Sequence, residues 1–184
     1  MTSIKIAFVL LLFVAATTIA APAQVQVFVP GNASGYFGNP VDLLVPLVAA
    51  ITVSGPGTIT VTYVSGTVDL GGGGIYTGPN GISMDMGTWQ TPLQEARGVA
   101  GGKVNNFGAL TGMFVPQPRV AHKGFSAVDG TKDATRVGVM PGWLFFIGES
   151  KTVDAKEAGT LFLGINDAGV NDNSGGFNVE VTVQ

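Results

Sequence analysis

The residues from Thr58 to Val68 alternate between β-branched and polar side chains, and Gly55, Pro56 and Gly57 stand directly before them. A period of two is the pattern of a half-buried β-strand, and glycine and proline mark the turn that precedes it. Four more short apolar segments have the same kind of boundary: FGALTGMFV, GWLFFIG, GTLFLGIN and GFNVEVTV. This repeated pattern predicts an all-β protein.

Helical periodicity is nearly absent. The best segment, Thr91–Ala100, predicts one or two helical turns with Thr91 as N-cap and Pro92 at the first position. Seven or eight short strands with many glycines predict a two-sheet β-sandwich of the jelly-roll or galactose-binding-domain-like type. Two long excursions, Gly71–Asn106 and Pro116–Arg136, interrupt the strands. Loops of this length are usually functional, so we expect binding there.

The start of the chain has the pattern of a secretory signal peptide. Lys5 precedes an unbroken apolar run, Ile6–Ala16, and small residues follow it. We predict cleavage after Ala23, with Ala20 as the alternative, and hence a secreted protein of the periplasm, the cell surface or the medium. No later segment reaches membrane-spanning length, since Leu43–Ile51 has nine residues and contains a proline.

The predicted mature chain of roughly 160 residues suits one domain. Residues 24–44 form either an extension or a first strand, and residues 45–184 form the sandwich. The chain has no cysteine, so packing, a metal ion or oligomerisation must replace disulfides in an oxidising compartment. The full chain has nine basic and twelve acidic residues; without Lys5, which lies in the signal, eight basic residues remain and the net charge of the mature chain is about −4. This balance argues against nucleic-acid binding.

Side-chain oxygens gather before the last strand, at Asn166, Asp167, Asn171, Asp172 and Asn173. Asp167 and Asp172 offer two carboxylates and Asn173 an amide oxygen, the donors that Ca²⁺ prefers. The single histidine, His122, and the lack of cysteine disfavour zinc. The spacing is not that of an EF-hand. A plain hairpin loop is the alternative, because turns prefer Asn, Asp and Gly in any case.

Catalytic chemistry is not indicated. His122 lies beside Lys123 in a charged stretch, where a histidine is usually exposed and has no catalytic role. No nucleophile and base stand in a recognisable arrangement, and nothing singles out a pair of carboxylates. We therefore predict that the protein is not an enzyme.

Two motifs near the end of the chain carry a family resemblance. GTLFLGIND, followed after a short gap by DNSGGFNVEV, resembles the C-terminal signature of the bacterial PA-IL-like (galactophilic) calcium lectins. SGTVDLG (Ser65–Gly71), GPNG (Gly78–Gly81) and GAL (Gly108–Leu110) are similar to family segments that occur in the same order. The resemblance covers roughly Val45 to Gln184.

The resemblance implies a calcium site and a carbohydrate ligand. The implied side-chain ligands are Asp167, Asp172 and Asn173, and the implied carbonyl ligands are Leu70 and Val170, with Gly169 as the alternative to Val170. The galactose-binding lectin has a Tyr at the position of Leu70 and a sugar-contacting His in the next loop. This chain has neither, so the resemblance does not imply galactose specificity.

Sugar contacts are expected in the Gly71–Asn106 excursion. Trp89 and Tyr76 offer aromatic faces, and Gln90 and Gln94 offer amides, which together are the groups that bind the two sides of a sugar ring. Anchoring of the loop by Trp89 is an equally good explanation for that residue.

The alternative function is a structural or self-assembling surface protein in which calcium only stabilises the fold. In that hypothesis the segment Val27–Pro46 adds a strand to a neighbouring subunit and the protein forms homo-oligomers.

Overall fold

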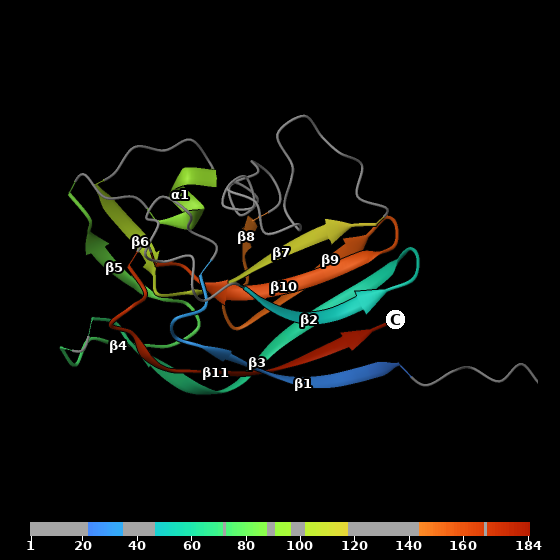
Figure 1. The fold of residues 1–184 in the computed structure, drawn as a ribbon, viewed down its shortest axis with the longest axis horizontal. Helices are drawn as coiled ribbons and strands as arrows, with labels where there is room; N and C mark the ends of the chain where they lie inside the picture. The colour runs from blue at the N-terminus through green and yellow to red at the C-terminus, as the bar shows by residue number, and fades with distance from the viewer. Residues whose placement is uncertain are drawn as a thin grey trace, which may run out of the picture.

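The computed structural model describes residues 22–34, 47–71, 73–87, 91–96, 102–117, 144–167 and 169–184. These residues form eleven strands in antiparallel sheets and one short helix, which confirms the predicted all-β sandwich (Figure 1). Within the same residues, no helix is long and apolar enough to cross a membrane.

The first sheet contains both ends of the domain. Its strands are β1 (Ala23–Pro30), β11 (Ser174–Val183), β3 (Gly57–Asp69) and β4 (Tyr76–Thr77), with β9 (Ser150–Ala155) beside the other end of β3. β3 is long enough to pair with β9 through residues 57–62 and with β4 through residues 68 and 69. β1 pairs with β11 over its whole length, so residues 24–30 are the first strand.

The second sheet has the order β2 (Val48–Val53), β10 (Gly159–Ile165), β7 (Leu110–Pro116) and β8 (Leu144–Phe146). A separate hairpin of β5 (Ile82–Asp85) and β6 (Lys103–Phe107) lies at one end of the sandwich, next to α1 (Pro92–Ala96) in Figure 1. The long excursion Gly71–Asn106 therefore contains β4, β5, α1 and most of β6 rather than an irregular loop. Its strands were missed because they are too short for alternation to stand out.

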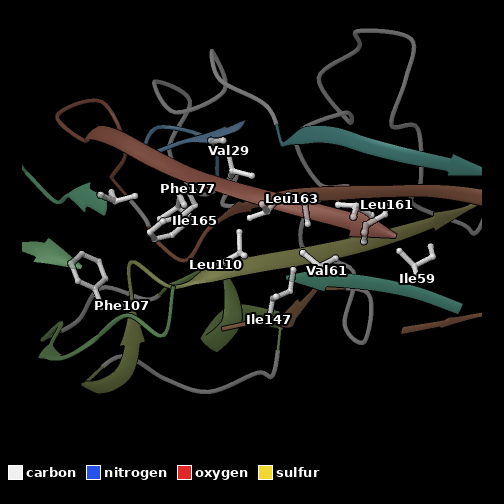
Figure 2. Close-up of a cluster of buried hydrophobic side chains, with 14 of the residues drawn as sticks. Val29, Ile59, Val61, Phe107, Leu110, Ile147, Leu161, Leu163, Ile165 and Phe177 are labelled. Atoms are coloured by element: carbon white, nitrogen blue, oxygen red, sulfur yellow. The ribbon is translucent and has the colours of Figure 1, made fainter. Parts of the chain in front are cut away.

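The core lies between the two sheets. Alternation directs Val29, Ile59, Val61 and Phe177 of the first sheet toward the second, and all four side chains are fully buried. Leu110, Leu161, Leu163 and Ile165 face them from β7 and β10 (Figure 2). Each such side chain contributes about 1.5–3 kcal/mol by leaving water.

One irregularity shapes the first sheet. The register between β11 and β3 shifts at Asn178 and Val179, which leaves Val64 as an extra residue on β3. Gly66 follows with φ of 106°, and a Cβ there would collide with the carbonyl oxygen of Gly176. Glycine is needed at this β-bulge because L side chains rarely adopt a positive φ.

The helix is the predicted one. α1 begins at Pro92, and the backbone N–H of Gln94 donates to Thr91 Oγ1 at 3.4 Å. Gln94 Oε1 in turn accepts the N–H of Thr91 at 2.9 Å. This reciprocal pair is a capping box, so Thr91 is the N-cap.

Candidate functional site

Three chain segments meet at the end of the sandwich where β10 passes to β11. We call the cluster of Gly31, Ser34, Gly71, Asp167 and Asn173 the terminal junction. Pairing brings the segments together, because the end of β1 lies beside Gly176 and the end of β3 lies beside Ser174. The loop from 166 to 173 must then pass between the residues that follow β1 and β3.

Asp167 is the buried charge of the terminal junction, with 4% of its surface exposed. Its Oδ1 accepts the N–H of Gly169 at 2.9 Å, and its Oδ2 accepts Asn173 Nδ2 at 2.8 Å. The backbone carbonyl of Asp167 accepts the hydroxyl of Ser34 at 2.7 Å. A carboxylate taken out of water is costly unless it is hydrogen-bonded or bound to a cation, and this one accepts a hydrogen bond on each of its two oxygens.

Asn173 connects the three segments through one side chain. Its Nδ2 donates to Asp167 Oδ2 and, at 3.0 Å, to the carbonyl oxygen of Gly31. Its Oδ1 accepts the N–H of Gly71 at 3.1 Å. An N–H cannot donate to an NH₂ group, so the contact with Gly71 fixes which way the amide points.

The other three predicted ligands lie around this pair. Asp172 is exposed, and its Oδ2 would lie 3.3 Å from a Cβ built on Gly71, the residue after Leu70. Val170 is buried, and its carbonyl oxygen accepts the N–H of Asn173 at 3.2 Å. Leu70 is also buried, and its N–H donates to the carbonyl of Ile75 at 3.0 Å.

The donor set is rich in neutral oxygens and poor in charge. Among the described residues, no three His, Cys, Asp or Glu side chains gather into a group that would hold a metal. Asp167 and Asp172 supply two carboxylates, and amide and carbonyl oxygens must supply the rest. Such a set does not suit zinc, which prefers Cys and His, but it suits Ca²⁺, which accepts carbonyl and amide oxygens.

A half-turn of the Asn173 amide tests the fit to calcium. The rotation would place Oδ1 where Nδ2 now lies, next to Asp167 Oδ2 and the carbonyl oxygen of Gly31. Three oxygens facing one another repel unless a cation lies between them. The rotation also turns the NH₂ group toward the N–H of Gly71, so a cation would fit here only if the turn at Gly71 moved as well.

The predicted sugar contacts fall into three groups. Tyr76 is 65% exposed and pairs with Asp69, which pairs on its other side with Ser174. This places an exposed aromatic residue two strands from the start of β11. Gln94 is buried in the capping box of α1 and does not line a surface. Trp89 and Gln90 lie outside the described residues, as does His122.

Sequence reasoning missed several members of the terminal junction. Gly31 and Ser34 lie more than a hundred residues before their partners, and no local pattern announces either contact. Asn166 belonged to the predicted oxygen cluster but has a structural role. Its Oδ1 accepts the N–H of Leu93 at 3.0 Å and its Nδ2 donates to the carbonyl of Asn106 at 2.8 Å, so it joins α1 to β6.

Comparison with known proteins adds no family. Models of known protein families do not match the chain, and a search of curated proteins finds no match.

Proposed function

We propose that this protein is a secreted carbohydrate-binding domain that holds one Ca²⁺ at the terminal junction. The contact between the buried carboxylate of Asp167 and the amide of Asn173 carries the proposal. These two residues lie six positions apart in the loop before β11, and both are ligands that the lectin resemblance implies.

Calcium replaces the amide donor of Asn173 in this proposal. Asp167, Asp172 and Asn173 would hold the ion through their side chains, and Gly31 and Val170 offer carbonyl oxygens nearby. Calcium accepts such a mixture of charged and neutral oxygens. The bound ion supplies positive charge to a buried carboxylate and leaves part of its oxygen shell to a ligand from outside.

Stabilisation by calcium would be large for a small domain without disulfides. A ligand that binds only the folded state stabilises it by about 2.7 kcal/mol at a hundred times its dissociation constant. The ion would tie the segment after β1 and the turn after β3 to the loop between β10 and β11, so three neighbouring strands of the first sheet would be held together at one end.

The sugar is proposed to bind beside the terminal junction. Tyr76 has the exposed aromatic face that packs against the C–H side of a sugar ring. Trp89 and Gln90 remain proposed contacts on the basis of the sequence alone. The low charge of the chain suits a neutral glycan better than nucleic acid.

Calcium binding is tested with Asn173→Asp. Without calcium this variant loses two donated hydrogen bonds and sets a second carboxylate beside Asp167, so its melting temperature should fall well below wild type. With calcium the added charge strengthens the site, and most of the loss should be recovered. Extracellular calcium modules often bind at about 10⁻⁴ to 10⁻³ M, so the titration must reach millimolar ion.

The matched control is Asp154→Asn, which removes an exposed carboxylate on β9. Its response to calcium should equal that of wild type. An equal loss of stability for Asn173→Asp with and without calcium would refute the calcium site.

Sugar binding is tested on a glycan array in millimolar calcium, with and without a chelator. We expect binding that the chelator abolishes and that Tyr76→Ala weakens about tenfold without a change in melting temperature. Trp89→Ala is the second variant, since its residue is proposed from sequence alone. A blank array in saturating calcium would count against the lectin.

A purely structural role is the second candidate, and one observation favours it. Asn173 already joins three segments through hydrogen bonds that need no ion. Calcium-dependent stability combined with a blank array would support this role over carbohydrate binding.

A further inference from the structure

β1 forms an outer edge of the first sheet. It pairs with β11 on one side, and none of the described strands pairs with its other side (Figure 1, blue). The register with β11 is unbroken from Ala23 to Pro30, so the edge is regular along eight residues.

The direction of the main-chain groups on β1 follows from one hydrogen bond. The N–H of Gly31 donates to the carbonyl of Gly175 at 2.9 Å, and Gly31 lies directly after the pair Pro30–Gly176. N–H and C=O groups point to alternate sides along a strand. Gln24, Gln26 and Phe28 therefore direct theirs to the open side. Pro30 has no N–H, and its carbonyl accepts the N–H of Ala33.

The usual protections of an edge strand are absent from β1. Natural edges carry charged side chains, bulges or mid-strand prolines that prevent pairing with another chain. β1 has no charged residue and no bulge, and its only proline is the last residue. The edge strand β9, by contrast, carries Lys151 and Asp154 along only six residues.

The side chains of β1 suit a copy of itself. Val25 and Val27 face the core but are only partly buried. Phe28 is on the opposite face and is 53% exposed. An antiparallel partner with the same sequence would set valine against valine on the inner face and glutamine against phenylalanine on the outer face, with no charge to repel.

We propose that β1 pairs with β1 of a second copy, antiparallel and centred on Gln26. In this register Gln26 faces its own counterpart and Gln24 faces Phe28 of the partner. All three residues have their N–H and C=O on the open side, and Pro30 is left out of the ladder. The two first sheets become one continuous sheet across a two-fold axis, the symmetry of most homodimers.

This inference is independent of calcium and sugar binding, because none of its residues belongs to the terminal junction. It differs from the alternative expected from sequence, in which Val27–Pro46 leaves its own chain. Here Val27–Pro30 stays in β1 and is bonded to β11, and only its free side takes a partner.

The test is the mass of the mature protein in solution with Gln26→Pro as the variant. Proline at this position removes the N–H on the open side and leaves the bonds to β11 intact, as edge strands tolerate. We expect a dimer for wild type and a dissociation constant raised at least a hundredfold for Gln26→Pro. Gln26→Thr keeps the N–H and should remain dimeric.

Hydrogen exchange supplies a second readout, which is measured on wild type alone and so does not depend on whether a variant folds. On dilution of wild type through the dissociation constant, the amides of Gln26 and Phe28 should lose protection while that of Val27, bonded to β11, keeps it. A wild type that is monomeric at all concentrations overturns the proposal. So does a dimer in which Gln26 and Phe28 exchange as fast as in the monomer.

Discussion

The middle of the sandwich and the terminal junction are stabilised in different ways, although the same strands pass through both. In the middle, β10 and β11 bring together fully buried side chains such as Leu161, Leu163 and Val181. At the junction, the residues between these two strands meet through a carboxylate, an amide and main-chain groups. The stability that apolar burial contributes does not require a bound ion. The stability of the polar cluster, by contrast, depends on which group compensates the charge of Asp167.

The difference explains where a bound ion can matter. Apolar packing has no direction and tolerates small shifts, so its contribution changes little with solutes at millimolar concentration. The free energy of a buried carboxylate depends strongly on its hydrogen-bond donors, because burial of the charge without a donor or a cation costs several kcal/mol. In the proposed function, the junction is therefore the part of the described structure whose stability calcium would change.

The largest effect is expected from Phe177→Ala, in the middle. The ring is fully buried and lies nearly perpendicular to the ring of Tyr63, with ring centroids 5.8 Å apart. Truncation leaves a cavity and should lower the free energy of unfolding by about 3–5 kcal/mol. Urea unfolding with and without calcium measures it, and the loss should be the same in both. A loss that calcium offsets would break the separation between the two regions.

An intermediate effect is expected from Asp167→Asn, in the junction. The change keeps the shape of the side chain but removes the charge that receives the amide of Asn173. Hydrogen bonds to charged groups contribute about 1.5–3 kcal/mol, and a loss of that order is expected without calcium. The rise in melting temperature that the proposed calcium site predicts for wild type should be absent from this variant. Asn166→Ala, a neighbouring buried residue, should destabilise while keeping the calcium response.

The smallest effect is expected from Thr91→Ala, outside both regions. This change removes the N-cap oxygen that accepts the N–H of Gln94, which costs about 0.5–2 kcal/mol. Thermal unfolding should show this modest loss with an unchanged calcium response. A loss as large as that of Phe177→Ala would mean that α1 supports the core more than its contacts indicate.

The sequence predicted the fold where one face of a strand is buried and the other is wet. β3 and β11 alternate over ten residues or more, so their pattern is unmistakable. β9, with the sequence SKTVDA, was missed because Val153 and Ala155 are its only apolar residues, and two residues are too few to show an alternating pattern. Pairs as short as Tyr76–Thr77 carry no periodicity, and only the neighbouring strand β3 determines their conformation.

Only the side-chain members of the candidate site that lie in the loop before β11 were predictable from the sequence. Asp167 and Asn173 lie in one loop, so local chemistry drew attention to both. Gly31 and Gly71 contribute a carbonyl and an N–H, and main-chain groups leave no trace in residue type. Asn166 shows the reverse, since its amide looks like a ligand in the sequence but is used to join α1 to β6.

The pairing of β1 with β11 also determines when the domain is able to form. Ala23 lies opposite Val183, so the first strand has no partner inside its sheet until the last ten residues exist. Contacts between the two ends of a chain close the longest loops and slow the search for the native state. β3 finds partners in β4 and β9 earlier in the chain, but its longest pairing is with the same strand, β11. β11 must therefore be synthesised before the first sheet is complete, and its deletion would leave β1 and β3 without their shared neighbour.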